Sequence, residues 1–431
     1  MSAASLAAVR GMNDVLPADI GAWQHLERVS AALFAAYGYE ELRVPVVEQT
    51  GLFKRAIGEF TDIVEKEMFT FSEADGESLT LRPEATAGVA RAAITNGLLR
   101  GARLKLWTCG PMFRHERPQA GRYRQFHQFS VEALGFAGPD IDIELIAMSA
   151  RLWKQLGLTG ITLKLNSLGT PESRRAYREQ LVGYFTQHAA LLDADSQRRL
   201  HGNPLRILDS KNPAMQAVVA GAPLLPEFLD AESREHFAAV CATLTAMQIP
   251  HVVDPRLVRG LDYYSRTVFE WVGDALGSQN AVCSGGRYDG LIAQLGGPAT
   301  PAIGFAMGVE RVVMLLQQAG SVPASAGADV YVITGGERAT RAGLALVERL
   351  RDALPGLRFE MNQGGGNFKA QFRRADRSGA RLALILGDEE MERGAAALKP
   401  LRQELAQAET PLAELPARIP ALLDTLQDRG G

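Results

Sequence analysis

Four arginines stand close together in one polar stretch of the sequence. They are Arg114, Arg117, Arg122 and Arg124. The turn-forming residues 117–121 lie among them, and alternating apolar residues on either side predict an antiparallel hairpin. Folding brings these like charges together, and because the planar guanidinium group matches phosphate oxygens, the pattern favours a polyphosphate ligand. A solvated basic hairpin is the alternative.

The strand after this turn carries an unusual set of side chains on one face. Side chains alternate along a strand, so residues two apart share a face. The set comprises Arg124, Phe126, Gln128, Ser130 and Glu132. A cation, an aromatic ring, an amide and a carboxylate are costly to bury unless a ligand pairs with them. Gln128 and Glu132 lie about 13 Å apart by strand rise, so they can hold different parts of one substrate, with the carboxylate binding an ammonium group.

Two further groups of polar residues are weaker signals. In the segment 259–264, an arginine and a glycine precede Tyr263 and Tyr264. Their hydroxyls can recognise a polar ligand, although paired tyrosines near strands are more often core residues. Glu84 ends the strand predicted at 80–84 and Thr86 follows it, and both can simply cap the next helix.

Glycines mark two places where the backbone can approach a partner closely. Residues 283–290 are glycine-rich but match neither nucleotide-binding glycine fingerprint. Gly304 and Gly308 bracket a predicted strand-to-helix transition, and Arg311 lies in the first turns of that helix. A helix N-terminus with an arginine can bind phosphate, and a purely structural role is the alternative.

Hydrophobic periodicity predicts the elements that position these residues. Helices are expected at 23–37 and 86–96, and strands at 42–47, 80–84, 104–109, 112–116, 123–134 and 266–272, with a strand-to-helix step at 304–316. Pro45 marks 42–47 as an edge or interface strand. Residues from about 174 to 250 form a predicted helical insertion between two strands.

A linker rich in Ser, Pro, Ala and Gly at 320–327 precedes a second predicted domain. Its strands are expected at 330–334, 357–362 and 382–386, and its helices at 338–354 and 367–377. Such alternation is typical of a small α/β domain with a mainly parallel core sheet. Lys369, Arg373 and Arg377 recur every four residues on the last helix, which fits either a phosphate contact surface or a solvated face.

Composition sets wider limits. The chain has 431 residues, with 46% hydrophobic and 22% charged, which is typical of a globular protein of two or three domains. The net charge of -3 means that nucleic-acid binding must depend on local basic patches. Three scattered cysteines favour neither a disulfide framework nor a structural zinc site, and we expect no metal site. The absence of a signal-peptide pattern and of a long apolar run predicts a cytoplasmic protein with no membrane partner.

Together, these motifs resemble those of class II aminoacyl-tRNA synthetases. Residues 113–116 look like the second motif of that class and residues 308–311 like the third. Ordered segments resemble the histidyl-tRNA synthetase family in particular, at residues 81–88, 110–128, 257–264, 284–291 and 364–369. Two places depart from the family: Ala85 stands where glycine is common, and residues 403–414 are less strand-like than the family's closing segment.

The resemblance implies an overall α/β fold in two domains. Residues 1–325 would form an α+β catalytic domain with an antiparallel sheet, helices and the insertion at about 174–250. Residues 326–431 would form an α/β anticodon-binding domain. The implied partners are L-histidine, ATP as a substrate with Mg, the histidine tRNA and a second copy of the chain. No tightly bound cofactor is implied, and residues 42–49 are the candidate dimer interface.

The same resemblance implies activation of histidine by ATP and transfer of the histidyl group to the tRNA. The implied catalytic residues are Arg114, Arg259 and Arg311. The implied histidine-binding residues are Glu84, Ala85, Thr86, Arg114, Gln128, Glu132, Arg259, Tyr263 and Tyr264. The implied ATP-binding residues are Arg114, Glu116, Arg122, Phe126 and Arg311. The implied tRNA contacts are Arg117, Gln119, Lys369, Arg373 and Arg377. Within these sets, Arg259 takes a role that other class II enzymes leave to a metal ion.

Two other functions compete with this one. A catalytically inactive relative of the synthetases can serve as a regulatory subunit in histidine biosynthesis. Such relatives lack the anticodon-binding domain, whereas this chain keeps a matching region and retains Arg114, Arg259 and Arg311. A nucleic-acid binding module without chemistry would leave Glu132 and the paired tyrosines unexplained.

Overall fold

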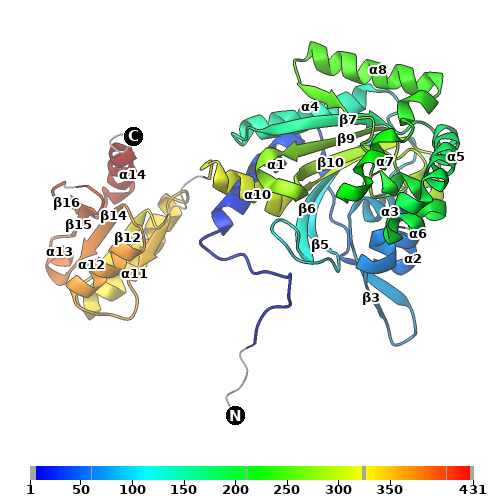
Figure 1. The fold of residues 1–431 in the computed structure, drawn as a ribbon. Helices are drawn as coiled ribbons and strands as arrows, with labels where there is room; N and C mark the ends of the chain where they lie inside the picture. Colours follow the sequence, from blue (N-terminus) through cyan, green and yellow to red (C-terminus); the bar gives the residue numbers. More distant parts are fainter. Residues whose placement is uncertain are drawn as a thin grey trace. The chain divides into compact units, whose positions relative to one another are not determined.

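The computed structural model describes residues 6–59, 61–208, 210, 212–322, 327–403 and 405–427. The chain divides into two compact units, Met1–Pro323 and Ala324–Gly431 (Figure 1). Within the described residues, no helix is both long and apolar enough to cross a membrane. Part of the predicted linker at 320–327 lies outside the described residues.

An eight-stranded sheet organises the first unit. Its order is β1-β5-β6-β11-β10-β9-β7-β8. The strands are β1 Glu40–Glu41, β5 Leu104–Phe113, β6 Gln125–Leu134, β7 Ile161–Ser167, β8 His251–Val253, β9 Ser265–Gly273, β10 Ala281–Arg287 and β11 Ala302–Gly308. Neighbours pair antiparallel except at the two ends, where β1 joins β5 and β8 joins β7 in parallel. The expected antiparallel sheet is therefore confirmed.

Helices cover one face of this sheet and bury the side chains that the central strands direct toward that face. They are α1 Ile20–Ala36, α4 Asp140–Gln155 and α10 Val309–Gln318, with α8 Ala231–Ala246 against α4. Phe129, Val131 and Ala133 of β6 lie in this core with Phe34 and Phe305. The alternate residues of β6 consequently point to the opposite face, as strand periodicity predicts.

The prediction of a strand at 42–47 is wrong. The chain leaves the large sheet after β1 and enters a small sheet at β2 Val47–Gln49, which pairs with β4 Ser78–Leu81 beside β3 Phe69–Ser72. Pro45 has no N–H to donate to a ladder. The carbonyl oxygen of Val44 accepts instead from Arg82 Nη1 at 2.9 Å, so a buried guanidinium takes the place of a neighbouring strand.

The two strands predicted at 104–109 and 112–116 are one continuous strand, β5. Gly110 and Pro111 suggested a break, yet both pair in register with β6. The N–H of Phe113 points away from β6 and donates to the Arg82 carbonyl. Pro111 lies two residues earlier, so its nitrogen faces the same way and its missing N–H costs no bond to β6. The predicted hairpin turn at 117–121 is present between β5 and β6.

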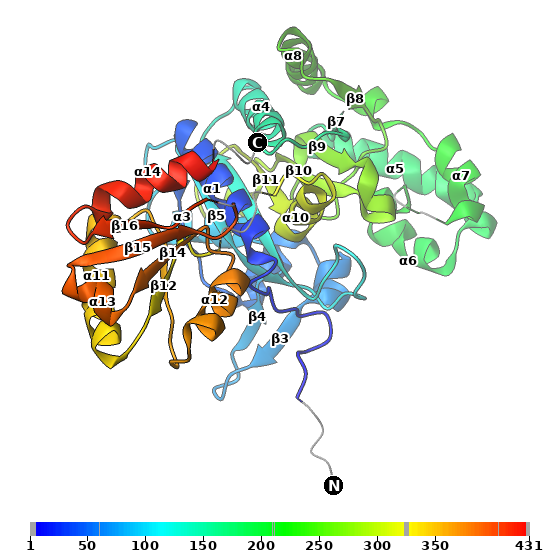
Figure 2. The same ribbon diagram turned by 90° about the vertical axis from the view of Figure 1, so that its left-hand side faces the viewer.

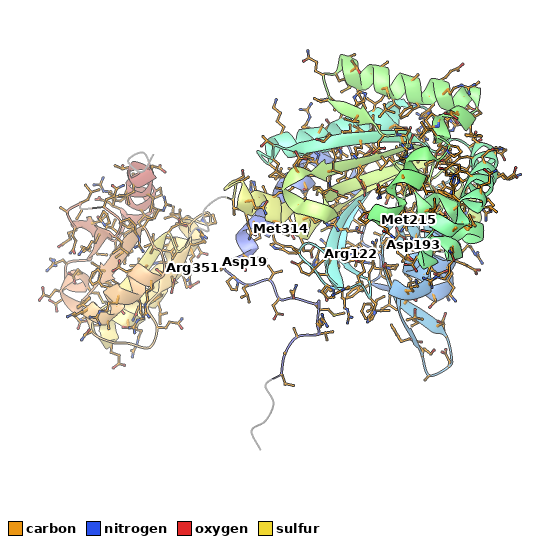
Figure 3. All side chains as sticks on the ribbon, viewed as in Figure 1. Asp19, Arg122, Asp193, Met215, Met314 and Arg351 are labelled. Carbon is orange, nitrogen blue, oxygen red and sulfur yellow. The ribbon has the colours of Figure 1, made fainter. Side chains whose placement is uncertain are left out.

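Helices fill the insertion, as predicted, and side-chain caps explain where they start. The remaining helices of this unit are α2 Thr50–Ile57, α3 Thr86–Thr95, α5 Pro171–Gln187, α6 Ala194–Gly202, α7 Gln216–Gly221 and α9 Leu291–Gln294, with short turns η3 Pro204–Ile207 and π-helical η1 Ile63–Glu67. Thr170, Asp193 and Asp230 accept backbone N–H bonds at the starts of α5, α6 and α8. The amide of Asp193 also lies against the sulfur of Met215 (Figure 3).

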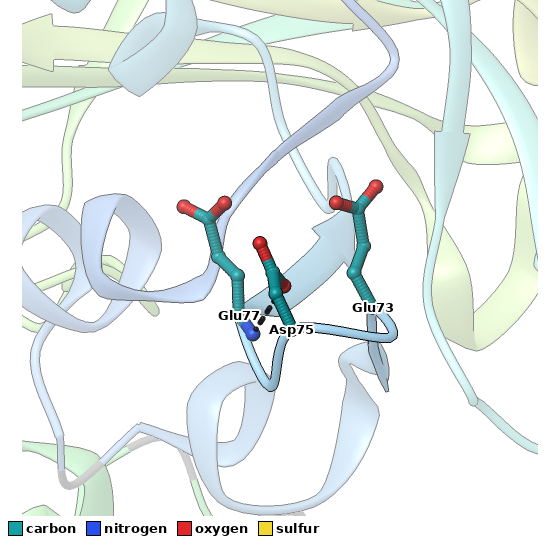
Figure 4. A group of neighbouring side chains, drawn as sticks. All are labelled: Glu73, Asp75 and Glu77. Carbon is teal, nitrogen blue, oxygen red and sulfur yellow. Dashed lines mark hydrogen bonds between the residues drawn. The ribbon is translucent and has the colours of Figure 1, made fainter.

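An exposed acidic turn joins β3 and β4. The ligand oxygens of Glu73, Asp75 and Glu77 all lie within 4.8 Å of one another (Figure 4). The N–H of Glu77 donates to Asp75 Oδ1 at 3.0 Å, so part of this clustering follows from the turn itself. We assign no site to it, because exposed acidic turns are common without an ion.

The second unit has a five-stranded sheet in the order β13-β12-β14-β15-β16. Its elements are β12 Val330–Thr334, α11 Glu337–Ala353, β13 Phe359–Met361, α12 Phe368–Arg377, β14 Leu382–Leu386, α13 Asp388–Glu392, β15 Ala395–Pro400, β16 Ala408–Pro411 and α14 Leu415–Gln427. The five predicted elements are all present, and β13, β12 and β14 are parallel. The region 403–414, which is less strand-like in sequence than the family's closing segment, contains β16, and β16 pairs antiparallel with β15. Helices α11 and α14 pack on one face and α12 on the other (Figure 2).

A fully buried ion pair ties three elements of the first unit together. Arg287 at the end of β10 and Asp142 in α4 are both 0% exposed, and Arg287 Nη2 lies 2.7 Å from Asp142 Oδ2. His236 of α8 approaches the same carboxylate at 3.0 Å. The other N–H groups of Arg287 also have partners, because Nη1 donates to Asp289 and to the carbonyl of Phe136.

Breaking this pair from one side should destabilise the first unit strongly. Asp142→Ala would leave the Arg287 charge buried without its partner, and we expect a loss of about 3–5 kcal/mol in free energy of unfolding. Denaturant unfolding measures the effect. Arg198→Ala, which removes an exposed pair with Asp195, should cost less than about 1 kcal/mol. Equal losses for the two variants would contradict the expectation.

Candidate functional site

One cavity of about 580 Å³ lies on the face of the sheet opposite helices α1 and α10. It collects most of the residues predicted for the site. The predicted residues that line it are Glu84, Thr86, Arg114, Glu116, Arg122, Phe126, Gln128, Arg259, Tyr263, Tyr264 and Arg311. They come from segments almost 230 residues apart in sequence, and the sheet brings them together.

Glu84, rather than Thr86, caps helix α3. Glu84 Oε2 accepts from the Thr86 N–H at 2.7 Å, and Oε1 accepts from the Ala87 N–H at 2.9 Å. Thr86 is the first helical residue, and its hydroxyl donates to Glu132 at 2.7 Å. Ala85 between them is buried with φ of -105°, so alanine is unstrained where the family commonly has glycine. The predicted capping role is therefore confirmed for Glu84 and wrong for Thr86, because Thr86 is already helical and its hydroxyl bonds to Glu132 instead.

Glu132 lies buried at the base of the site, just behind the lining residues. It accepts hydrogen bonds from the hydroxyls of Thr86 and Tyr288. Burial raises the pKa of Glu132 to about 8. Gly304 faces it on β11, and a Cβ at that glycine would overlap the Glu132 carboxylate. The carboxylate is therefore held in a space that glycine keeps open, and a cationic ligand would stabilise its charged form.

Three tyrosines form the apolar side of this end of the cavity. Tyr263, Tyr264 and Tyr288 are all nearly fully buried, with the rings of Tyr263 and Tyr264 4.7 Å apart and those of Tyr263 and Tyr288 5.5 Å apart. Burial raises the pKa of Tyr264 to about 12, so its hydroxyl stays protonated. The pocket thus offers neutral hydroxyl groups beside one carboxylate, a combination suited to a small ligand that carries N–H donors.

Arginines line the other end of the cavity. Arg114 Nε donates to the Pro83 carbonyl at 2.9 Å, and its guanidinium lies 5.2 Å from the centre of the Phe126 ring. Arg311 Nε donates to the Gly121 carbonyl at 2.9 Å, which ties α10 to the hairpin. Burial lowers the pKa values of Arg114 and Arg311, which shows that both charges are desolvated. A desolvated group of positive charges is a site for an anion.

Arg259 sits between the two ends of the cavity. Its Nη1 donates to Glu270 Oε1 at 2.7 Å and its Nη2 to Ser284 Oγ at 2.6 Å. Its guanidinium carbon also lies 6.0 Å from the centre of the Tyr264 ring. These contacts from β9 and β10 fix the plane of the guanidinium group in the cavity wall. Arg259 is therefore placed to meet an anion whose other end reaches the tyrosines.

Arg122 and Glu116 close the hairpin side of the cavity. The two side chains form an ion pair, and Arg122 also lies 3.8 Å from Glu67 of η1. Arg117 and Gln119 are exposed at the turn and are not among the described residues that line the cavity. Lys369, Arg373 and Arg377 are exposed along α12 of the second unit. None of these five residues is among the described residues that line the cavity.

Sequence patterns did not single out several residues that the cavity contains. Glu270, Ser284 and Glu310 line it, as do Arg199 and Arg206 from the insertion. Alternation along β9 could have pointed to Glu270, because an isolated acidic residue there shares the inward face with apolar neighbours. No local pattern indicates the two insertion arginines, because only the folded chain places them at the cavity.

The chain matches known proteins over most of its length. The family model described as histidyl-tRNA synthetase matches residues 11–312, and the one described as anticodon binding domain matches residues 329–422. The structure of apo histidyl-tRNA synthetase from S. aureus is 34% identical, with a TM-score of 0.81, covering 96% of this chain and 100% of that chain.

Two more distant structures share the fold. Histidyl-tRNA synthetase from Nostoc sp. PCC 7120 is 18% identical with a TM-score of 0.70, covering 97% of this chain and 100% of that one. A Bacillus halodurans C protein is described as an ATP phosphoribosyltransferase regulatory subunit/histidyl-tRNA synthetase. It is 20% identical with a TM-score of 0.64, and the match covers 88% of this chain and 98% of that one.

Replacing Glu132 with glutamine should change how stability depends on pH. The folded pKa of Glu132 is about 8 against an ordinary value of 4.5, so the folded protein keeps a proton that the unfolded chain releases. Its favourable contribution is complete below about pH 4.5 and is lost as the pH rises to about 8. We expect the stability of Glu132→Gln relative to wild type to rise by about 1.4 kcal/mol per pH unit across this window.

Denaturant unfolding of the first unit at a series of pH values measures this difference. Glu172→Gln, at an exposed position in α5, is the matched control and should show a nearly constant difference from wild type. A constant difference for Glu132→Gln as well would contradict the buried, proton-holding carboxylate.

Proposed function

The chain belongs to the histidyl-tRNA synthetase family, and from that premise we propose that it is a histidine–tRNA ligase. It would activate L-histidine with ATP to histidyl-adenylate and pyrophosphate, and then transfer the histidyl group to the 3′ end of the histidine tRNA. One observation carries the proposal: a single cavity joins a desolvated arginine group to a buried carboxylate among tyrosine hydroxyls. An adenylate needs both environments within one site.

The arginine end suits ATP. Phe126 offers a ring face for adenine, with Arg114 beside it for the α-phosphate. Arg311 would bind the outer phosphates, and Glu116 with Arg122 would close the site from the hairpin. Arg114 donates one N–H to the Pro83 carbonyl, and Arg311 donates to the carbonyls of Gly121 and Ala281, which fixes their remaining donors in place before ATP arrives. Such preorganised charge is the main source of catalysis in phosphoryl and adenylyl transfer.

The carboxylate end suits histidine. Gln128 and Glu132 would hold the amino group, and Glu84, Thr86, Tyr263 and Tyr264 would contact the rest of the amino acid, with Ala85 backing them. Arg259 lies between this end and the arginines, where it would stabilise charge that develops on the α-phosphate. Since these polar groups are buried, an amino acid that leaves them unpaired would bind much more weakly.

Magnesium would enter with ATP as part of the substrate. Mg²⁺ usually keeps several waters and binds phosphate oxygens with one or two carboxylates. Glu270 and Glu310 are carboxylates that line the cavity and would be the residues to meet it, although Glu310 also accepts from the His127 N–H. Glu270 is also paired with Arg259, so the protein holds its own cation where the α-phosphate would lie.

The tRNA would contact both units. The exposed turn with Arg117 and Gln119 would meet the acceptor end, and the exposed row of Lys369, Arg373 and Arg377 would meet the anticodon region. We propose that residues 1–325 and 326–431 are the two functional domains and that the protein works as a cytoplasmic homodimer. Strand β2, with Val47 37% exposed at the edge of its sheet, supports 42–49 as the dimer segment.

A regulatory subunit of histidine biosynthesis is the second candidate, favoured by the match to the Bacillus halodurans C protein. At 20% identity, that match shows that the two proteins share a fold and does not show a shared function. The retained cavity arginines Arg114, Arg259 and Arg311 support the ligase instead. Histidine-dependent exchange of pyrophosphate into ATP separates the two.

We expect purified protein to exchange pyrophosphate into ATP with histidine and with no other standard amino acid. Arg259→Ala should lower the exchange rate about 100-fold or more, since removing one preorganised charge donor costs on the order of 3 kcal/mol in barrier. Arg259→Lys keeps the charge without the planar fork and should recover part of the rate. No exchange by the wild type, or exchange driven equally by other amino acids, would refute the ligase, and near-normal turnover of Arg259→Ala would remove Arg259 from catalysis.

The basic row on α12 should affect tRNA binding and leave activation intact. Changing Lys369, Arg373 and Arg377 together to alanine should raise the KM for the histidine tRNA. The slope of log affinity for the tRNA against log salt concentration should become shallower by about one unit for each phosphate that is no longer neutralised. Pyrophosphate exchange should be unchanged. A matched triple variant on α11, Arg338→Ala with Arg341→Ala and Arg349→Ala, removes three exposed charges and should not alter the KM. Identical effects of the two triples would overturn the assignment.

A further inference from the structure

The helical insertion contacts the loop that carries Tyr263 and Tyr264. Arg174, one turn into α5, donates from Nη1 to the Asp262 carbonyl at 3.1 Å and to the Tyr264 carbonyl at 2.6 Å. These two carbonyls flank Tyr263. One guanidinium nitrogen thus fixes the backbone on both sides of a buried residue of the cavity.

Asp262 gives the same loop further attachments. Its carboxylate accepts from Asn203 Nδ2 of the insertion at 2.9 Å, and its N–H donates to the Ile57 carbonyl at 3.1 Å. A Cβ at Gly58 would overlap the Asp262 carboxylate. Burial lowers the pKa of Arg174, while the charge of Asp262 acts in the opposite direction. The contact is therefore a desolvated and closely packed one, in which hydrogen bonds to a charged donor are strong.

A second attachment joins the insertion to the catalytic unit. Arg199 of α6 and Arg206 of η3 both bind Asp62, at 3.0 Å and 3.2 Å, just before η1. Both arginines also line the cavity. The insertion is thereby attached both to Asp62 and to the tyrosine loop, so it forms a base for that loop.

We propose that the insertion anchors the tyrosine loop and that Arg174 is its positioning residue. Arg174 acts through Tyr263 and Tyr264, since it is not among the described residues that line the cavity. Naming histidine as the ligand of these tyrosines rests on the proposed function. Without Arg174, the ATP side keeps its geometry, while the tyrosines lose a fixed backbone. The loss therefore falls on recognition of the amino acid.

The test compares Arg174→Ala with Arg174→Lys and with Arg175→Ala, the matched control at the exposed next position of α5. We expect Arg174→Ala to raise the KM for histidine in pyrophosphate exchange about 10-fold or more. The KM for ATP should change less than about 2-fold, because the arginine end is untouched. Arg174→Lys, whose ammonium can still donate to the carbonyls, should recover part of the loss, and Arg175→Ala should match wild type.

Amide hydrogen exchange provides a readout that does not depend on activity. Amides in residues 259–264 should exchange faster in Arg174→Ala, with the rest of the first unit protected as in wild type. Unchanged protection there, or an equal rise in both KM values with loss of protection throughout the unit, would overturn the positioning role. Absence of histidine-dependent exchange in the wild type would refute the proposed function alone, because protection of the loop still decides whether Arg174 anchors it.

Discussion

Strand β6 directs apolar side chains into the core from one face and polar side chains toward the cavity from the other. The rest of the site depends on this alternation. Its odd-numbered residues Phe129, Val131 and Ala133 lie in the core beneath the helices, whereas Phe126, Gln128 and Ser130 line the cavity and Glu132 lies just behind them. A shift in register by one residue would put the glutamate into the core and the phenylalanine into the cavity. The ladders with β5 and β11 prevent this shift, and Gly304 of β11 leaves the space that Glu132 occupies.

Electrostatics divides the cavity along this strand. At one end, Arg114 and Arg311 donate hydrogen bonds to backbone carbonyls, which hold the two side chains in place. Burial keeps their charges poorly solvated. At the other end, Glu132 is buried beside hydroxyl groups and its pKa is raised. Both ends therefore gain free energy from a ligand that brings the opposite charge or supplies N–H donors. An amino acid joined to a nucleotide phosphate meets both requirements in one molecule.

The failures of sequence reasoning have physical causes that lie outside the local pattern. Proline and glycine suggested that β5 is interrupted, yet the strand continues because the nitrogen of Pro111 faces away from its partner. Glu84 and Thr86 were both possible caps of α3, but Thr86 is the first helical residue, so the free N–H groups bond to Glu84 alone. The stretch at 42–47 has strand-like residues, but its carbonyls are taken by a guanidinium and the chain changes sheets there.

The sequence by itself determined which residues share the faces of β6 and α12 and where α12 begins, because periodicity and capping act within a few residues. It also carried the family motifs, from which the antiparallel sheet, the second α/β unit and most of the cavity's lining could be predicted. Only the tertiary structure decided that Glu270, Tyr288, Arg199 and Arg206 join the site and that Arg174 holds the tyrosine loop. Those contacts join residues far apart in the chain, and their energies depend on burial and distance, which no local sequence pattern contains.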